Sequence, residues 1–462
     1  MTDTMRLAER LCDAAATVPE PVARAARLHL IDAIGVGVAA SAAGPVPGVS
    51  SLADACAGPS TVFGRSDGTS PALAALANGA LIHSLEFDDT HTASVVHGSS
   101  VLAAAALAAA EATGATGREL VSAFAVGWEL FIRIGLASPG GLQRQGFQVT
   151  SAGGPFAAAA VSALLHRDEP AILAHALGIA GSQAGGTFAF LATGDTVKAA
   201  QVGWAAHAGV MAAELARAGV TGPAAVFDGP YGFYRLYARD DEAGTRFGAL
   251  VETLGAVWQL PEAAFKLLPC CHYLHPFVEA LQQALRGVDP RDVVGIHCEV
   301  PTEVVPIIAE PWAERQRPPR TQDARWSLPY VMGEVVRHGG VDAATFVGEV
   351  DREVLAAAEL VSYEPWEGSG FPTRFPARIR VRFRDATERR VEIDDVRGGS
   401  SRPLEDDLVV GKARENLRIG GVPAAAAEDL LGTLLDAAPD LARVSAALRA
   451  PRIATEQERA HD

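Results

Sequence analysis

Long apolar runs, separated by Gly, Pro and Ser, fill the first 265 residues of the chain. Their length is that of helices, and no Val/Ile alternation typical of strands stands out among them. We therefore expect residues 1–265 to form a helical domain. The predicted helices are Leu28–Val38, Pro71–Leu85, Val101–Ala112, Glu119–Ile134, Pro155–His166, Ala171–Ala184 and Ala199–Ala216.

The pattern changes after about Phe265, where apolar and polar residues begin to alternate. Val293–Val300 is typical of a strand. Ala377–Arg384 alternates apolar residues with arginines, and Asp385–Thr387 is a plausible turn into a partner strand at Arg390–Ile393. Such a pair of alternating segments around a short turn predicts a β-hairpin. We expect the arginines to form its solvated face rather than a binding patch.

A helix predicted at Ala343–Ala358 lies between these strands, so residues 266–403 have the pattern of a smaller α+β domain. The helical pattern returns from Asp406 to Leu448, and we expect residues 404–450 to pack back onto the first domain. The charged tail, 451–462, is expected to fray. The predicted fold class is mainly α, with a large all-helical domain built from both chain ends and a smaller inserted α+β domain.

Composition and charge narrow the class of protein. The formal net charge of −16 argues against nucleic acid and anionic membrane as partners, because both reward clustered Lys and Arg. The five cysteines are irregularly spaced and form no CxxC pair, which indicates reduced thiols rather than disulfides or a zinc site. Residues 1–11 lack the apolar core of a signal peptide, and residues 33–53 are a poor membrane span. We expect a soluble, cytoplasmic protein.

Three histidines and three carboxylates gather within residues 83–97, in a segment otherwise nearly free of charge. Burying Glu86, Asp88 and Asp89 as ions is costly unless they orient cations or histidines in a pocket. Two other interpretations stay open: the acids cap helices beside surface histidines, or the cluster binds a metal ion. Metal binding is the less favoured, because no HExxH spacing is present and two adjacent Asp side chains rarely converge on one ion.

His97 directly precedes the predicted helix Val101–Ala112, and Ser99 or Ser100 is the predicted N-cap of that helix. Free N–H groups at a helix N-terminus attract anions, and Gly98 would let an anion approach closely. A histidine in this place would act as acid or base toward a bound carboxylate.

Lysine is rare in this chain and occurs as Lys198, Lys266 and Lys412. Lys198 begins a helix of small residues, and Lys266 lies where the fold changes. In a chain that uses arginine on its surface, these two are candidates to hold a substrate carboxylate. The alternative is that each lies on the surface with its aliphatic stem packed against the protein.

Residues 77–91, Ala-Asn-Gly-Ala-Leu-Ile-His-Ser-Leu-Glu-Phe-Asp-Asp-Thr-His, resemble the signature of the MmgE/PrpD family. That family contains 2-methylcitrate dehydratase, cis-aconitate decarboxylase and iminodisuccinate epimerase. Further family motifs follow in the same order, so the resemblance covers nearly the whole chain. They are Gly229–Phe233, Phe265–His275, Ser327–Tyr330 and Arg402–Leu404.

The resemblance implies a homodimer, with a lid domain inserted into the helical domain and a cofactor-free pocket between the two domains. From the missing ligand spacing and the irregular cysteines, we also expect no bound metal. By motif position, the family's site falls on Glu86, Thr90, His97, Lys198, Lys266 and Tyr330. Three further residues complete the predicted substrate-binding set: Gln148, Gln201 and His275. Gln148 and Gln201 stand where many members have histidine, and amides cannot shuttle protons near neutral pH.

The sequence therefore predicts a cofactor-free lyase or isomerase that transfers a proton on a small carboxylate-bearing substrate. Lys198 and Lys266 would anchor anionic groups, His97 would transfer the proton and Tyr330 would assist as a donor. Glu86 and Thr90 would position His97. A 2-methylcitrate dehydratase-like reaction is the leading candidate.

Two alternatives remain. In the first, the fold serves as an isomerase, decarboxylase or cyclase for a less acidic, biosynthetic substrate that does not need the missing histidines. The chain would otherwise be a non-catalytic binding homologue, against which the retention of His97, both lysines and Tyr330 counts.

Overall fold

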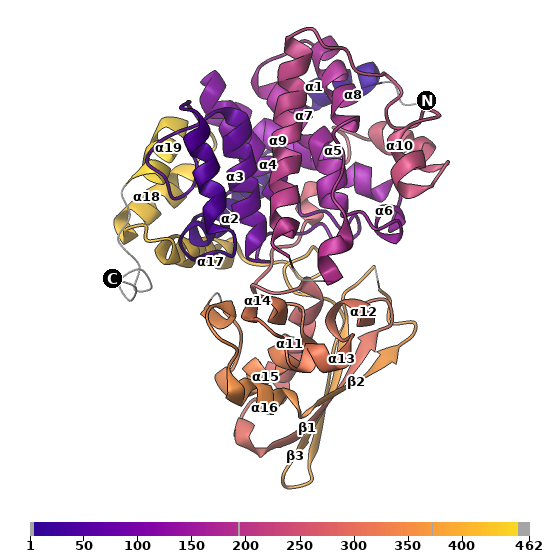
Figure 1. Cartoon of the computed structure of the whole chain (residues 1–462), viewed down its shortest axis with the longest axis vertical. Coiled ribbons are helices and arrows are strands. Elements are labelled where there is room, and N and C mark those ends of the chain that lie inside the picture. The colour runs from indigo at the N-terminus through magenta and orange to yellow at the C-terminus, as the bar shows by residue number, and fades with distance from the viewer. Residues whose placement is uncertain (1–3, 193–194, 343, 372, 451–462) are drawn as a thin grey trace. The chain divides into compact units, whose positions relative to one another are not determined.

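The computed structural model describes residues 4–192, 195–342, 344–371 and 373–450 (Figure 1). Contacts within the chain divide it into two compact units. Unit 1 consists of residues 1–84, 88–265 and 405–462, and unit 2 of residues 85–87 and 266–404. The tail 451–462, for which fraying is expected, lies outside the described residues. The fold is mainly α with one four-stranded sheet, which confirms the predicted fold class.

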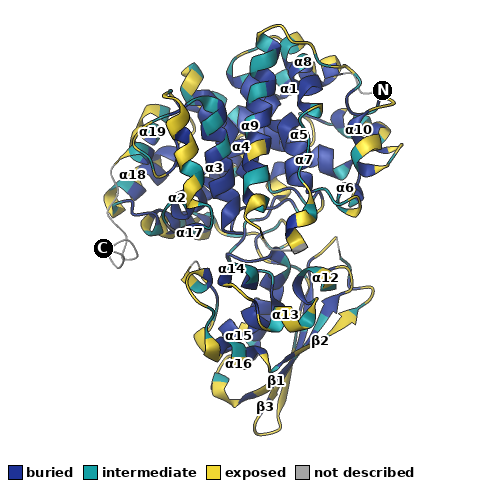
Figure 2. Cartoon of the chain, in the orientation of Figure 1, coloured by how far each residue is buried: buried dark blue, intermediate teal, exposed yellow. Residues whose placement is uncertain are grey.

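Unit 1 is built from helices, and each of the seven helices predicted before residue 265 overlaps one of them, although α2 and α7 begin eight and six residues earlier than predicted. Figure 2 shows that its central helices are almost wholly buried. Its α-helices are α1 (Thr4–Ala16), α2 (Glu20–Ala43), α3 (Pro71–Ser84), α4 (Gly98–Thr113), α5 (Gly117–Leu136), α6 (Gly141–Arg144), α7 (Val149–Leu165), α8 (Pro170–Gly181), α9 (Val197–Arg217), α10 (Ala243–Val251), α17 (Asp406–Ile419), α18 (Ala424–Leu435) and α19 (Leu441–Arg449).

Small residues allow the central helices to approach closely. α3 packs against α4 and α9, and α7 packs against α9. At the crossing of α3 and α9, a Cβ on Gly203 would lie 2.2 Å from the carbonyl oxygen of Leu76. Any larger residue there would force the two helices apart, so the crossing depends on glycine.

The long apolar helix α2 lies in the core of unit 1. By length and composition, residues 20–42 could cross a membrane, but 83% of an apolar 18-residue stretch of this helix is buried inside the protein. α17 and α18 pack against α2, so the C-terminal part of the chain returns to the helical unit. A buried Asp32 on α2 is paired with Lys412 on α17. α2 is therefore a core helix of unit 1.

Unit 2 combines a mixed sheet with short helices. The strand order is β2-β1-β3-β4, in which β1 is parallel to β2 and antiparallel to β3. The strands are β1 (Val293–Pro301), β2 (Val361–Trp366), β3 (Ala377–Phe383) and β4 (Glu388–Ile393). The α-helices are α11 (His275–Ala284), α12 (Val305–Ile308), α13 (Trp312–Gln316), α14 (Thr321–Ala324), α15 (Leu328–His338) and α16 (Arg352–Ala358).

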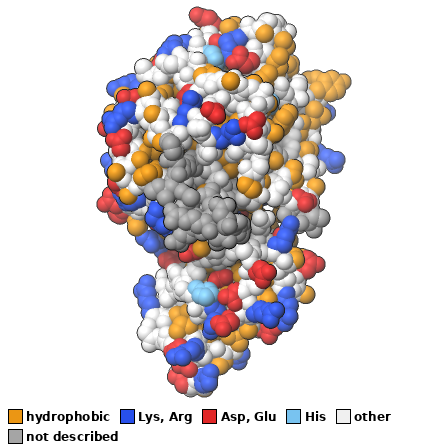
Figure 3. Space-filling model, turned by 60° about the vertical axis from the view of Figure 1, so that its left-hand side comes forward, with side chains coloured by type: hydrophobic (Ala, Val, Ile, Leu, Met, Phe, Trp, Pro, Cys, Tyr) orange, Lys and Arg blue, Asp and Glu red, His pale blue; other side chains and the backbone are white. Residues whose placement is uncertain are grey.

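The hairpin of β3 and β4 confirms the alternation seen in the sequence. Ile379, Val381 and Phe383 are buried, whereas Arg378 pairs with Glu299 and Glu392 on the other face. On the face of each unit that Figure 3 shows, acidic and basic side chains are interspersed rather than gathered by sign.

Two sequence-based expectations for unit 2 need correction. The helix predicted over Ala343–Ala358 exists only as α16, preceded by a 3₁₀ turn at Ala344–Phe346, and residue 343 itself lies outside the described residues. Gly348, with φ of +85°, interrupts the helical path. Strand β2 was not predicted. It contains Pro365 and lies at the edge of the sheet, where a strand tolerates proline.

Candidate functional site

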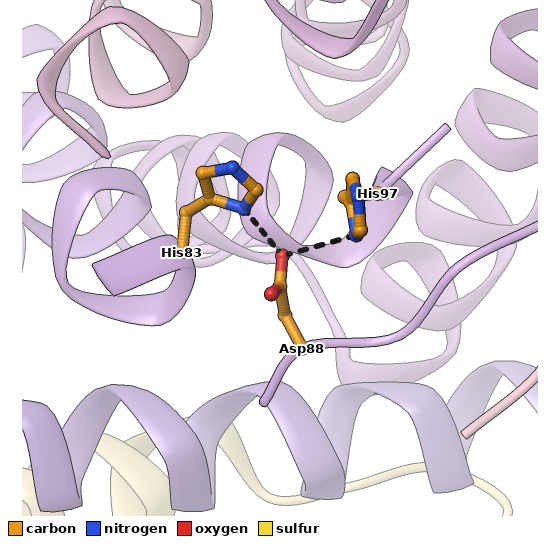
Figure 4. Close-up of side chains that lie close together, drawn as sticks. All are labelled: His83, Asp88 and His97. Carbon is orange, nitrogen blue, oxygen red and sulfur yellow. Dashed lines mark hydrogen bonds and ion pairs between the residues drawn. The ribbon is translucent and has the colours of Figure 1, made fainter. Parts of the chain in front are cut away.

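Two histidines and an aspartate meet in unit 1, where α3 ends and α4 begins (Figure 4). His83 lies in the last turn of α3, Asp88 in the following loop and His97 at the N-cap of α4. Asp88 Oδ2 lies 2.7 Å from Nδ1 of His83 and 3.8 Å from Nδ1 of His97. The two rings meet edge to face, with centroids 5.1 Å apart. His83 and Asp88 are fully buried, so their pairing takes place in a low dielectric.

The tautomer of His97 follows from its partners. Nδ1 lies 2.9 Å from the backbone carbonyl oxygen of Asp89 and 3.0 Å from Oγ1 of Thr90. A carbonyl oxygen can only accept, so Nδ1 carries the proton and Nε2 carries the lone pair in the neutral ring. Thr90 therefore lies where its predicted role, the positioning of His97, requires it. The second positioning group is the backbone of Asp89, which the sequence could not indicate.

The N-terminus of α4 already has an anion, the carboxylate of Asp89. Its Oδ1 accepts from the N–H of Ser99 (3.2 Å), and its Oδ2 accepts from the Ser99 hydroxyl. His97, not Ser99 or Ser100, is the N-cap, so the predicted N-cap is wrong, and the Ser99 N–H that was expected to be open to a substrate anion already has a partner in the protein. Gly98 serves packing instead, because a Cβ there would lie 2.5 Å from the Trp128 ring.

Gln148 and Gln201 contact each other and His83. Nε2 of Gln201 donates to Oε1 of Gln148, which also accepts from the Ser151 hydroxyl (2.7 Å). Nε2 of Gln148 lies 3.1 Å from Nε2 of His83. Because the amide donates there, this chain of contacts favours a neutral His83 with its proton on Nδ1, facing Asp88. The two glutamines thus belong to the histidine cluster.

Two other residues of this region differ in their role. Lys198, half-buried, lies one helical turn before Gln201 on α9, so both are on one helix face. His91 is buried, with Nδ1 2.8 Å from the Ser94 hydroxyl, and burial lowers its pKa to about 4. His91 is therefore a neutral structural residue at physiological pH.

Lys266 and Glu86 form a buried pair within unit 2. The Lys266 side chain is 1% exposed, and its Nζ lies 3.2 Å from the backbone carbonyl oxygen and 3.7 Å from Oε2 of Glu86. Glu86 has φ of +54°, an uncommon conformation for a non-glycine residue, which is often found at functional sites. The predicted anion anchor thus carries an internal carboxylate partner, and Glu86 pairs with Lys266 rather than standing as a separate acid.

Unit 2 gathers further polar groups that the sequence did not single out. Buried His272 packs edge to face with the predicted residue His275, with centroids 4.8 Å apart. Arg325 is buried over the ring of Phe346, and burial lowers its pKa to about 10. The available signal was position: His272 lies between Lys266 and His275, and Arg325 lies two residues before the motif that begins at Ser327.

Tyr330 lies on α15, buried, beside Glu334. Burial, reinforced by Glu334, raises its pKa to about 12, so its hydroxyl stays protonated and can act as a donor. Tyr330 and Glu334 line a pocket of about 650 Å³ with His338 and Asp351, all within unit 2.

A metal ion could in principle use His83, Asp88 and His97, whose potential ligand atoms lie within 4.8 Å of one another. Nδ1 of His83, however, faces Asp88 Oδ2 at 2.7 Å, and Nδ1 of His97 donates to the Asp89 carbonyl. A donating nitrogen has no lone pair for an ion. The hydrogen-bonded arrangement fits a proton-transfer cluster better than a metal centre.

Both halves of the chain match one family of enzymes. The MmgE/PrpD N-terminal domain matches residues 6–246, and the MmgE/PrpD C-terminal domain matches residues 268–433. The chain belongs to the MmgE/PrpD family, which confirms the resemblance seen in its motifs.

Similar proteins of known name point to one kind of enzyme. The cis-aconitate decarboxylase-like protein oryM of Aspergillus oryzae (strain ATCC 42149 / RIB 40) is 31% identical over 70% of this chain and 71% of its own length. Cis-aconitate decarboxylase of Homo sapiens is 29% identical over 77% of this chain and 75% of its own length. That of Aspergillus terreus is 28% identical over 59% of this chain, and the match spans 58% of the relative. These matches support a lyase-type enzyme.

Proposed function

We propose that this protein is a cofactor-free lyase for a small carboxylate-bearing substrate, and that it acts by proton transfer at His97. The observation that carries the proposal is the pair of contacts from Nδ1 of His97 to the Asp89 carbonyl and Thr90. They hold the ring with Nε2 as its basic atom, so proton exchange with a substrate takes place at Nε2.

Decarboxylation is the reaction with most support, because the relatives are named as cis-aconitate decarboxylases. In such a reaction the bond to a carboxylate carbon breaks and CO₂ leaves. The electron pair shifts through the neighbouring double bond, and the far carbon takes a proton from protonated His97. Lys198, Lys266 and Arg325 are the candidate cations for the substrate's carboxylates. The names of the relatives give no support to 2-methylcitrate dehydration in particular.

A second candidate is the same chemistry on a less acidic substrate. The specific observation is the contact of Gln148 with both Gln201 and His83. Amides bring no positive charge to this part of unit 1, and their contact favours a neutral His83. A substrate with one or two carboxylates suits such surroundings better than a tricarboxylate does.

A substrate screen in D₂O tests the proposal. The purified protein is incubated with cis-aconitate, 2-methylcitrate, and unsaturated mono- and dicarboxylic acids, and NMR follows product formation and deuterium at carbon. We expect CO₂ release and deuterated product from at least one unsaturated acid. His297→Asn, in a half-buried histidine of the sheet, is the matched control and should behave as wild type. Tight binding without turnover or exchange across the screen would instead support a non-catalytic homologue.

We also propose that the protein is a homodimer. The resemblance to the family suggests it, and α9 supports it by exposing Val197 and Trp204, seven residues apart on one helix face. Light scattering of the purified protein, with Trp204→Glu as the disruptive variant, tests the oligomeric state.

A further inference from the structure

Unit 1 contains a buried set of charges next to the histidine cluster. Nζ of Lys412, on α17, lies 2.7 Å from Oδ1 of Asp32, on α2, and both side chains are almost completely buried. One turn earlier on α2, His29 places Nδ1 2.6 Å from Oδ2 of Asp89. Two helices that are far apart in the sequence thus bring an ion pair and a histidine to the loop that carries Asp88 and Asp89.

These groups act on one another electrostatically. Burial lowers the pKa of Lys412, and the carboxylates of Asp32, Asp89 and Asp88 oppose that fall. Burial raises the pKa of Asp32 to about 6; Lys412 opposes the rise, Asp89 adds to it and His29 counteracts it. In a low-dielectric interior such charges remain coupled over several ångströms. The ion pair and the loop carboxylates therefore form one network.

The network reaches His97 through both loop carboxylates. Asp89 is held by His29 and Ser99, and its backbone carbonyl accepts from Nδ1 of His97. Asp88, 3.8 Å from the same nitrogen, also accepts from His83. Among the contacts described for residues 4–192 and 405–450, the charged or titratable groups that face His97 are Asp88 and His83, and behind them lie Asp89, His29, Asp32 and Lys412.

We propose that Lys412 and Asp32 are positioning residues for His97: their opposite charges, acting through Asp88 and Asp89, set the pH at which His97 gains its proton. This proposal rests on the proposed function only in so far as His97 is used in catalysis; the effect of the two charges on the pKa of His97 does not depend on it. The ammonium of Lys412 interacts electrostatically with the carboxylates of Asp88 and Asp89, and those residues in turn hold His83 and His97 with their protons on Nδ1.

The two charges have opposite effects, so the proposal fixes the sign of each substitution. Lys412→Met removes a positive charge, which favours the protonated imidazolium and raises the pKa of His97. Asp32→Asn removes a negative charge and lowers it, in the range above about pH 6 where Asp32 is ionised. The double variant Asp32→Asn/Lys412→Met removes no net charge, so its His97 should titrate close to the wild-type value. We expect shifts on the order of one pH unit for each single variant.

NMR titration of protein labelled in histidine measures this pKa without any substrate, and His97→Asn assigns the His97 signal. If the substrate screen yields turnover, the acid limb of the pH–rate profile should shift in the same directions. If the screen yields no turnover but the two single variants shift the pKa of His97 in opposite directions, the proposed function is wrong and the electrostatic role stands. The converse result, turnover without shifts, would overturn the positioning role alone.

A second buried ion pair, Glu129 with Arg133 on α5, provides the matched control. Its described contacts outside α5 go to the segment of residues 250–260, not to the histidines. Glu129→Gln should lower stability and leave the His97 titration unchanged. If one charge variant of the network fails to fold, the other single variant and the double variant still decide the sign. Equal or absent shifts in the folded variants would overturn the proposal.

Discussion

Nδ1 of His97 lies 2.9 Å from the backbone carbonyl oxygen of Asp89, so the residue that orients the ring does so through its main chain. The carboxylate of Asp89 is meanwhile committed to His29 and to Ser99 at the start of α4. One residue therefore fixes the helix end and the histidine tautomer together. This arrangement leaves Nε2 of His97 as the atom for proton exchange.

The two lysines proposed to bind carboxylates should differ when replaced by methionine. Lys266→Met leaves Glu86 buried without its cation, and losing one partner of a buried pair costs roughly 3–5 kcal/mol of unfolding free energy. Lys198 is half-buried, so Lys198→Met should barely change stability. Chemical denaturation measures both variants, and equal stabilities would contradict the pairing of Lys266 with Glu86.

In binding, each lysine variant should lose a charge-assisted contact worth about 1.5–3 kcal/mol. Titration calorimetry with the acid found in the substrate screen measures this loss. The double variant Glu86→Gln/Lys266→Met separates binding from folding, because it removes both charges of the pair. Wild-type affinity in both single variants would refute the assignment of the lysines.

The contact between Gln148 and Gln201 should make the protein a poor catalyst for tricarboxylates. Neither amide can carry the charge or supply the proton that an imidazole would. We expect the Gln148→His/Gln201→His variant to gain turnover on cis-aconitate or 2-methylcitrate relative to the unmodified protein. The comparison needs a histidine-bearing relative assayed in parallel. If the unmodified protein turns over these acids as fast as the histidine-bearing relative does, the glutamines merely fill the space of histidines.

His91 should make stability depend on pH. Its pKa falls from 6.5 to about 4 on burial, so between these values the unfolded chain binds a proton that the folded protein does not. The stabilisation is complete above about pH 6.5 and is lost as the pH falls toward 4, by about 3 kcal/mol in total. His91→Asn should lack this component in urea denaturation at several pH values. His338→Asn, in an exposed histidine, should retain it; an unchanged pH slope in His91→Asn would argue against a buried neutral ring.

Activity should not require a metal ion. Nδ1 of His83 and Nδ1 of His97 donate hydrogen bonds, and neither nitrogen can bind an ion without losing its partner. Dialysis against a chelator should leave turnover unchanged. Complete loss of turnover that a single divalent ion restores would place a metal at His83, Asp88 and His97 instead.

The sequence predicts much of the helical unit because its signals are local. Apolar runs mark each helix, whereas the close crossing of α3 and α9 at Gly203 is seen only in the structure. β2 was not predicted, because its sequence contains Pro365 and lacks alternation. It forms a strand by pairing with β1. The helix expected at residues 343–358 fails at Gly348, where a positive φ breaks the path.

The candidate site divides in the same way. His97, Thr90 and both glutamines could be named from motifs, and the structure brings them together with His83. The roles of Asp89, His29 and Lys412 could not be predicted, because each depends on contacts between segments far apart in the chain. The N-cap of α4 was mispredicted for the same reason: the sequence does not show that the loop brings the Asp89 carboxylate to this helix end, where it accepts from the Ser99 N–H.

The most direct test of the account is the turnover of His97→Asn on the best acid from the D₂O screen. Asparagine can keep a hydrogen bond to the Asp89 carbonyl but cannot exchange a proton near neutral pH. We predict that turnover and deuterium incorporation fall by on the order of a hundredfold or more, while the melting temperature stays near that of the wild type. Near-normal turnover would contradict the account and move the proton transfer to Tyr330 or His275.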